Sequence, residues 1–226
     1  MEDKLLVLIT GNIAAGKSTF AVAFLETYKE FNCRIISADL FYENLFSKIE
    51  DMDKRYMYAK EHAYCELAQL IKCGQSFIWE AVLTDIKQVN VLMSAYESGY
   101  KIICYEVQVQ NLDKLIERSN NRHEEGCYFV NGAKINDRSN KQNIYLSKAN
   151  DIFDIHIVVY NEDSPNLAVL KKTVAVNDSS IINLFADKNK LSLLENTMIN
   201  CVQRKMRYKE RINYLEFLIN DANDIN

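Results

Sequence analysis

Hydrophobic residues along the chain form short continuous runs separated by longer segments with helical spacing. Runs of strand length, suited to strands buried on both faces, occupy Leu5–Thr10, Cys33–Ser37, Ser76–Trp79, Lys101–Val109 and Asp154–Tyr160. Helical spacing is found over Lys17–Phe31, Asp53–Cys73, Ile86–Ser98 and Leu112–Arg122. Strands that alternate with helices predict an α/β fold, in which a parallel β-sheet is flanked by helices.

Two segments depart from this alternation. Residues 123–143 are rich in Asn, Gly and charge and lack a periodic apolar pattern, which favours either a mobile lid or an ordinary surface loop. Beyond the only proline, Pro165, the pattern predicts a strand over Leu167–Val176 and then helices. We therefore expect a core over residues 1–165, with the lid at about 123–143, and a mostly helical C-terminal extension over 166–226 packed on the same domain.

The last helix combines an apolar stripe with a basic polar face. The stripe consists of Tyr208, Ile212, Leu215 and Ile219, and the basic residues are Arg204, Lys205, Arg207, Lys209 and Arg211. This combination is typical of a helix with one side in the core and the other in solvent, and the alternative is a contact with nucleic acid or a membrane.

Composition and charge exclude several classes of protein. With 226 residues, 48% hydrophobic and 26% charged, the chain is globular, not disordered, collagen-like or a coiled coil. The net charge of −4 argues against a protein that coats nucleic acid. The apolar run after Met1–Lys4 is too short for a signal peptide or a membrane span, so we expect a cytoplasmic protein without membrane contact.

The cysteines show neither a CxxC pair nor the spacing of a metal site. They are Cys33, Cys65, Cys73, Cys104, Cys127 and Cys201. Most lie within apolar or amphipathic runs, which predicts reduced and mostly buried thiols.

A phosphate-binding loop follows the first predicted strand. The segment Gly11-Asn12-Ile13-Ala14-Ala15-Gly16-Lys17-Ser18-Thr19 matches G-x-x-x-x-G-K-[ST] and leads into a helix. In such a loop, backbone N–H groups surround the β-phosphate, and glycines allow the bends. Lys17 is expected to reach the β- and γ-phosphates, and the Ser18 hydroxyl to ligate Mg²⁺. The sequence thus predicts a P-loop NTPase fold that binds a nucleoside triphosphate and Mg²⁺.

Two carboxylates follow predicted strands at the edge where open α/β sheets bind ligands. Asp39 could take the proton of an acceptor hydroxyl, orient Mg²⁺ through a water, or cap the helix beginning at Leu40. Glu80 could hold the hydroxyls of an acceptor while Trp79 shapes the pocket. Alternatively, Glu80 pairs with a lysine at the sheet edge.

Arginines near the predicted lid are candidates for stabilising a transferring phosphoryl group. Arg118 and Arg122 lie four residues apart on one helix face, and Arg138 is expected to open the next helix. Arginines from a lid stabilise negative charge in phosphoryl transfer, so we expect at least one of the three to be catalytic, the alternative being surface arginines. The histidines, His62, His123 and His156, lack metal-ligand spacing and are interpreted as structural or exposed.

The order of these parts resembles the zeta-toxin-like P-loop kinases, which phosphorylate a hydroxyl of a small molecule such as UDP-N-acetylglucosamine. The matching segments are Gly11–Thr19, Ser37–Phe41, Ser76–Leu83, Ser98–Ile102, Arg118–Arg122, a lid containing Gly126, Ile135–Arg138 and Tyr160–Glu162. The resemblance spans about Leu5 to Asp163. Two departures are a lid without the family's Gly-Gly-His-x-Val-Pro pattern, and Ala81 and Val82 in place of hydroxyl residues after Glu80.

The resemblance implies an ATP- and Mg²⁺-dependent kinase that acts on UDP-N-acetylglucosamine. It implies Lys17 and Ser18 on phosphate and metal, Asp39 as general base, Glu80 on the substrate, and Arg122 and Arg138 as transition-state arginines. It also implies a small neutralising antitoxin-type protein as partner. The alternatives are a kinase for a nucleoside, a nucleic-acid 5′-hydroxyl or an antibiotic, and a nucleotide-binding interaction protein with little turnover.

Overall fold

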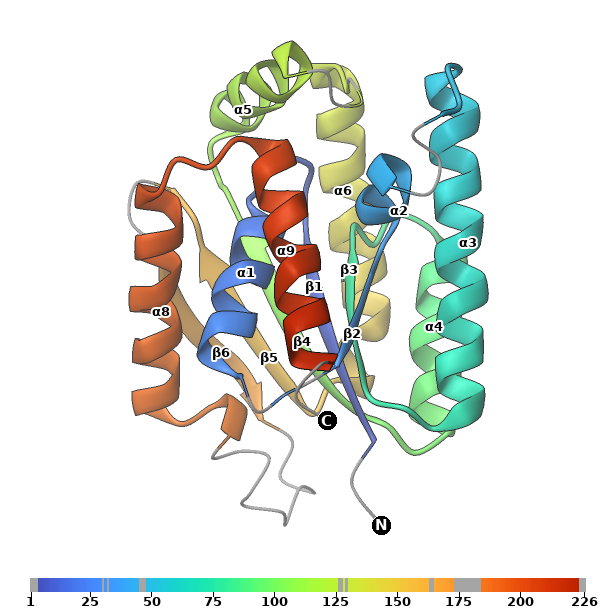
Figure 1. Cartoon of the computed structure of the whole chain (residues 1–226). Coiled ribbons are helices and arrows are strands. Elements are labelled where there is room, and N and C mark those ends of the chain that lie inside the picture. The colour runs from blue at the N-terminus through green and yellow to red at the C-terminus, as the bar shows by residue number, and fades with distance from the viewer. Residues whose placement is uncertain are drawn as a thin grey trace.

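A six-stranded β-sheet forms the centre of the computed structural model, which describes residues 4–29, 31, 33–44, 48–125, 128, 130–162, 165–172 and 184–223 (Figure 1). The strands are β1 (Leu5–Gly11), β2 (Arg34–Ser37), β3 (Phe77–Ala81), β4 (Lys101–Gln108), β5 (Ile155–Tyr160) and β6 (Asn166–Lys172). Their order is β2-β3-β1-β4-β5-β6, with β1 to β5 parallel and β6 antiparallel to β5. The predicted α/β fold is confirmed, with an antiparallel strand at one edge.

Helices cover both faces of the sheet. One face carries α1 (Lys17–Thr27), α8 (Lys188–Gln203) and α9 (Tyr208–Asn223), and the other α3 (Met52–Cys73), α4 (Ile86–Glu97), α6 (Gly132–Ala149) and the short 3₁₀ helix η1 (Asn150–Ile152). Because side chains alternate along a strand, Val7 and Ile9 pack on the α1 side while Leu6 and Leu8 pack on the α3 side. The short α2 (Ala38–Asn44) follows β2 directly, and α5 (Leu112–Glu124) follows β4 after a short connection.

Side-chain caps set the start of several helices. Asp51, Asp85, Asn111, Asn131 and Asp187 each accept hydrogen bonds from backbone N–H groups in the first turn of α3, α4, α5, α6 and α8. These groups have no partner within the helix itself, so a short polar acceptor stabilises the helix start by about 1 kcal/mol.

The segment predicted as a lid is more helical than its polar composition indicates. Helix α5 continues to Glu124, and α6 begins at Gly132, so the expectation of an aperiodic insertion is wrong for residues 132–143. The Asn131 cap and the fully buried Ile135 account for the start of this helix. Arg138 therefore lies in the second turn of α6 and does not open it. Gly126, Cys127 and Phe129 lie outside the described residues.

The C-terminal helices pack on the helix that follows the phosphate loop. Leu194 and Met198 of α8 and Ile212 and Leu215 of α9 are buried in the same hydrophobic cluster as Phe24 of α1. Strand β6 overlaps the predicted strand 167–176 and begins one residue before it; residues 173–176 are outside the described part of the chain, as is Asp163.

The expectation of mostly buried cysteines holds only in part. Cys104 and Cys201 are buried and Cys33 is partly buried, but Cys65 and Cys73 are exposed on α3. Burial raises the pKa of the Cys33 and Cys201 thiols to about 12, which keeps both protonated at neutral pH.

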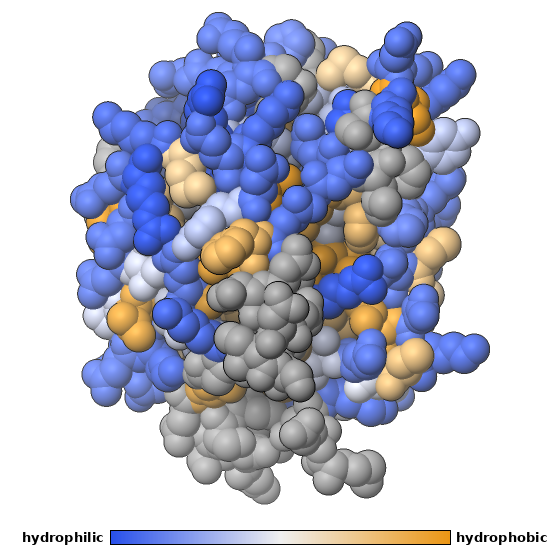
Figure 2. Space-filling model, viewed as in Figure 1, coloured by the Kyte–Doolittle hydropathy of each residue, from blue (hydrophilic) through white to orange (hydrophobic). Residues whose placement is uncertain are grey.

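The visible surface is largely polar. On the face shown in Figure 2, hydrophilic side chains predominate and apolar ones form small, separate groups. Within the described ranges, no helix has both the length and the apolar character needed to cross a bilayer.

A methyl group at Gly11 is expected to destabilise the fold. Gly11 has φ +151°, and a Cβ there would lie 2.3 Å from the backbone oxygen of Val107 on β4. Gly11→Ala should therefore lower the free energy of unfolding by about 2–4 kcal/mol, since the backbone oxygen it meets cannot rotate away. Gly99→Ala is the control, because its φ is +82° but no atom lies within 4 Å of the added Cβ. Equal losses of stability for the two variants in urea unfolding would contradict this explanation.

Candidate active site

The phosphate loop between β1 and α1 is held in shape by hydrogen bonds to its own backbone. The N–H of Ala15 and the Nζ of Lys17 both donate to the carbonyl oxygen of Asn12, at 3.2 and 3.1 Å. Gly16 has φ +102°, and a Cβ there would lie 2.3 Å from Nδ2 of Asn161. Glycine is therefore required at this bend both for its backbone angle and for the close approach of the Asn161 side chain.

Asn161 joins the end of β5 to the phosphate loop and to α5. Its Nδ2 donates to the carbonyl oxygen of Ala15 at 2.7 Å, and its own carbonyl oxygen accepts from both Nη atoms of Arg118 at 3.2 Å. Arg118 also donates to the carbonyl oxygen of Glu162 at 3.1 Å. Arg118 thus holds the strand end against the loop. Asn161 was not among the residues predicted for the site, although its position after a parallel strand is a signal for one.

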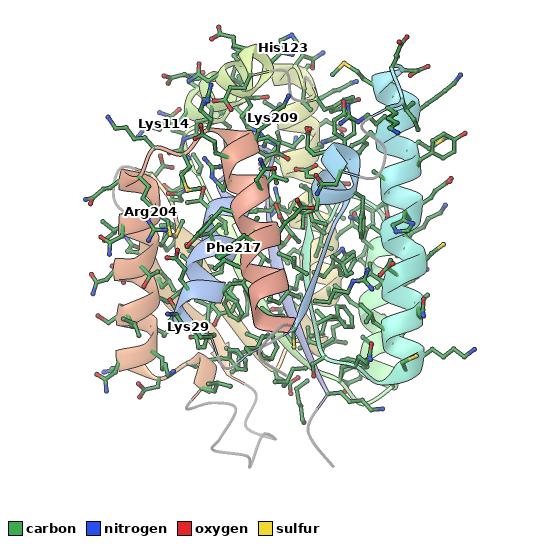
Figure 3. The ribbon with its side chains drawn as sticks, in the orientation of Figure 1. Lys29, Lys114, His123, Arg204, Lys209 and Phe217 are labelled. Carbon is green, nitrogen blue, oxygen red and sulfur yellow. The ribbon has the colours of Figure 1, made fainter. Side chains whose placement is uncertain are left out.

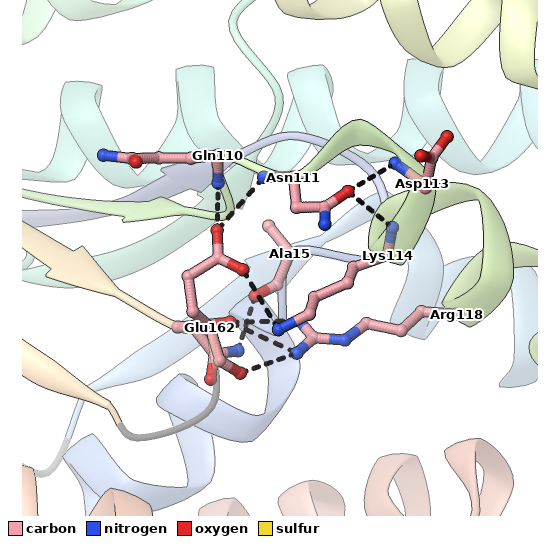
Figure 4. A network of polar contacts seen from close by, with 8 residues as sticks. Ala15, Gln110, Asn111, Asp113, Lys114, Arg118 and Glu162 are labelled. Carbon is pink, nitrogen blue, oxygen red and sulfur yellow. Dashed lines mark hydrogen bonds and ion pairs between the residues drawn. The ribbon is translucent and has the colours of Figure 1, made fainter.

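The start of α5 is tied to the same strand end. Oε1 of Glu162 accepts from the backbone N–H of Gln110 and from that of Asn111, the latter at 3.1 Å, and Oε2 lies 3.5 Å from Nζ of Lys114 (Figure 4). The carboxylate of Glu162 is therefore occupied by groups of the protein.

Glu80 lies beside the phosphate loop because β3 pairs with β1. The register places Glu80 opposite Ile9, and Oε1 of Glu80 accepts from the Ser18 hydroxyl at 3.1 Å. Burial raises the pKa of Glu80, an effect that the nearby Lys17 opposes; burial likewise lowers the pKa of Lys17, opposed by Glu80 and Asp39. Oε2 of Glu80 is buried and has no hydrogen-bond partner among the described residues. A hydroxyl and a buried carboxylate with a free oxygen fit the oxygen ligands and waters that surround Mg²⁺.

Asp39 and Arg122 approach each other from opposite sides of the site. Asp39 lies in the first turn of α2, directly after β2, and its side chain is 32% exposed. Oδ2 of Asp39 is 3.6 Å from an Nη of Arg122, which comes from the last turn of α5. The Arg122 guanidinium also lies 3.9 Å from the centre of the Tyr208 ring of α9. Contacts among α2, α5 and α9 thus hold the Arg122 guanidinium next to Asp39.

Two cavities flank these groups. The first is lined by Asp39, Trp79, Arg138, Tyr56, Tyr64 and Gln88, among others. The second is lined by Gly16, Ser18, Thr19, Arg118, Asn161 and Arg211, among others. Lys17, Glu80 and Arg122 line both cavities. The two spaces therefore meet at a buried lysine, a buried carboxylate and an arginine.

Most of the site residues expected from the sequence thus come together, and others join them. Tyr56 and Tyr128 stack in the wall of the first cavity, with ring centres 5.1 Å apart, and their spacing in the sequence gave no sign of it. Lys205 and Arg211 line the second cavity, although the sequence favoured a solvated face for them. His156 is buried, with Nε2 3.0 Å from Glu106, in neither cavity.

No family model and no curated protein matches this chain. Several solved structures, however, have a similar fold. A chain of the PezAT chromosomal toxin–antitoxin system of Streptococcus pneumoniae is 16% identical, with 90% of this chain and 89% of that chain covered and a TM-score of 0.59. A chain of the AvrRxo1-ORF1:AvrRxo1-ORF2 structure with ATP is 13% identical over 96% and 81%, with a TM-score of 0.55. A chain of the Pnkp1/Rnl/Hen1 RNA repair complex is 19% identical over 66% and 47%, with a TM-score of 0.51. This chain shares their α/β fold.

Proposed function

We propose that this protein is an ATP- and Mg²⁺-dependent phosphotransferase that acts on a hydroxyl of a small molecule. The observation that carries the proposal is the meeting of two cavities at Lys17, Glu80 and Arg122. A kinase needs one space for the nucleotide and another for the acceptor, and their junction must hold the transferred group. The similarity in fold to a chain of a structure solved with ATP agrees with this assignment.

The second cavity is the proposed nucleotide site. The N–H groups of the phosphate loop and the Lys17 ammonium would bind the phosphates, while Arg122 and Arg138 would stabilise the charge on the transferred group. Ser18 and Glu80 would hold Mg²⁺, directly or through its waters. When bound, Mg²⁺ neutralises phosphate charge and orients the phosphates for in-line attack.

The first cavity is the proposed acceptor site, with Asp39 as general base. The acceptor oxygen forms a bond to the γ-phosphorus, the bond from that phosphorus to the bridging oxygen of ADP breaks, and the hydroxyl proton passes to the Asp39 carboxylate. An Nη of Arg122 lies 3.6 Å from Oδ2 of Asp39, so the arginine proposed for the transferred group lies beside the proposed base.

We propose UDP-N-acetylglucosamine as the acceptor. The proposal rests on the resemblance to zeta-toxin-like kinases and on an acceptor cavity that combines aromatic side chains, Tyr56, Tyr64 and Trp79, with the polar Gln88 and Lys60. Such a lining suits a molecule with ring faces and hydroxyls.

Product analysis tests the acceptor. The protein is incubated with ATP, Mg²⁺ and one acceptor at a time: UDP-N-acetylglucosamine, a nucleoside, an oligonucleotide with a 5′-hydroxyl, or an aminoglycoside. Mass spectrometry should detect a phosphorylated sugar nucleotide and no comparable product from the others. A phosphorylated product from another acceptor would overturn the choice of substrate and leave the kinase assignment in place.

We also propose a small neutralising protein as partner, by analogy with the toxin–antitoxin system of similar fold. Expression of the chain alone should then slow bacterial growth, and the Lys17→Ala variant should not. Equal growth with the two proteins, at equal expression levels, would argue against a toxin and its partner.

Glu80→Gln is expected to raise the Mg²⁺ requirement. The amide keeps the size of the side chain and its hydrogen bond to Ser18 but removes the charge that would hold the metal and its waters. The Mg²⁺ concentration for half-maximal phosphotransfer should rise about 10–100-fold. Glu106→Gln is the matched control, because Glu106 is a buried carboxylate of the neighbouring strand β4 that lines neither of the two cavities. An unchanged Mg²⁺ dependence in Glu80→Gln would remove Glu80 from the metal site.

A further inference from the structure

The second cavity is strongly basic, and part of its charge comes from the C-terminal helices. Its cationic side chains are Lys17, Arg118, Arg122, Lys205 and Arg211, and its acidic ones are Glu80 and Glu162. Since Glu162 already accepts from the backbone N–H of Asn111 and pairs with Lys114, it does little to neutralise the other cations. An excess of cations in one cavity fits a polyphosphate.

Arg211 is the most distinctive of these cations. It lies in the first turn of α9, is half-buried, and donates from Nη2 to the carbonyl oxygen of Met206 at 2.8 Å. Within the described part of the chain it forms no ion pair. Burial lowers the pKa of its guanidinium, and the positive charge of Arg122 acts in the same direction. A partly buried cation beside another cation is unfavourable until an anion enters the cavity.

The helical pair α8–α9 is fixed to the helix that follows the phosphate loop. Glu26 of α1 accepts from Nη1 of Arg204 at 2.6 Å and from the Tyr214 hydroxyl at 2.9 Å. In addition, Met198 and Ile212 are buried in the hydrophobic cluster that contains the apolar side chains of α1. Arg211 is thus carried by a well-anchored part of the fold.

A second set of contacts holds the start of α9 against the end of α5. The backbone N–H of Tyr208 donates to Oε2 of Glu125 at 2.7 Å, and the Arg122 guanidinium packs on the Tyr208 ring. In Figure 1 the turn between α8 and α9 lies at the same end of the molecule as α5. Residues of the C-terminal helices, and of the turn between them, therefore form part of the wall of the second cavity.

We infer that Arg211 binds the polyphosphate of the nucleotide, so that the α8–α9 pair is part of the nucleotide site. The inference rests on the proposed function, because it assigns the second cavity to the nucleotide. Arg211 lines this cavity but not the acceptor cavity. It should therefore contact the phosphates that remain in ADP, and contribute to the binding of ATP and ADP alike.

Calorimetric titration of ATP, ADP and inorganic tripolyphosphate tests the inference. Arg211→Ala should weaken the binding of all three about 10–100-fold, the range for a charge-assisted hydrogen bond, and Arg211→Lys should recover part of the loss. Lys209→Ala is the matched control: Lys209 is an exposed cation of the same helical turn, does not line the cavity, and should leave the affinities unchanged (Figure 3).

Thermal unfolding without ligand separates binding from a structural role. Arg211→Ala should melt within about 2 °C of the unaltered protein, while the rise in melting temperature caused by ATP should shrink. Unaltered affinities in Arg211→Ala, or equal losses in Lys209→Ala, would overturn the inference and leave the proposed function in place. Failure of the unaltered protein to bind any of the three ligands would instead overturn the proposed function.

Discussion

Replacing Asp39 with Asn should lower kcat for phosphotransfer by about 10²–10⁴-fold, the usual contribution of a general base. The amide has nearly the same size as the carboxylate, but it cannot take up the acceptor proton. Since Asp39 lines the acceptor cavity and not the nucleotide cavity, the Kd for ATP should stay unchanged. Steady-state kinetics and ATP titration measure the two effects separately.

Asp137→Asn is the control for this prediction. Asp137 is an exposed carboxylate of α6 that pairs with Lys141 at 2.7 Å and lines neither cavity, so its replacement should leave kcat and the ATP affinity as they are. An Asp39→Asn variant with normal kcat would remove Asp39 from its role as general base. The other two interpretations of Asp39, as a partner of Mg²⁺ or a helix cap, would then stand alone.

Lys17→Ala should lower kcat/KM by about 10²–10³-fold and weaken ATP binding. Lys17 is 8% exposed, and its ammonium donates to the carbonyl oxygen of Asn12 inside the loop that would hold the phosphates. Loss of a buried cation leaves the opposing phosphate charge without a partner, at a cost of about 3–4 kcal/mol. Lys29→Ala is the control, because Lys29 is an exposed cation just beyond the end of α1, the helix that begins at Lys17 (Figure 3). A Lys17→Ala variant that turns over ATP normally would contradict the assignment of the phosphate loop.

The sheet and the phosphate loop could be predicted because their signals are local. Five strands read from continuous apolar runs are present, and the loop Gly11–Thr19 lies between β1 and α1 as its glycine spacing indicates. The strand ends at Asp39 and Glu80 likewise indicated the edge of the sheet at which the first cavity is found.

The parts of the candidate site that could not be predicted depend on contacts between segments far apart in the sequence. The pairing of Asp39 with Arg122 joins residues from α2 and α5, and nothing in either segment signals it. Arg211 has the helical position of a solvated cation, and only the packing of α9 on α1 and α5 turns it toward the cavity. The start of α6 was missed for another reason: the polar composition around Asn131 hid a helix whose buried face is narrow.

If the two cavities serve one transfer reaction, the γ-phosphate of ATP must reach an organic acceptor, and this transfer can be traced. ATP labelled with ¹⁸O in its γ-phosphate is incubated with the protein, Mg²⁺ and a bacterial metabolite extract, and all labelled products are followed by mass spectrometry, with Lys17→Ala as the blank. A labelled organic phosphate should form with the unaltered protein and should be absent with Lys17→Ala. ATP binding without any Lys17-dependent organic phosphate would contradict the transfer reaction and favour a nucleotide-binding interaction protein.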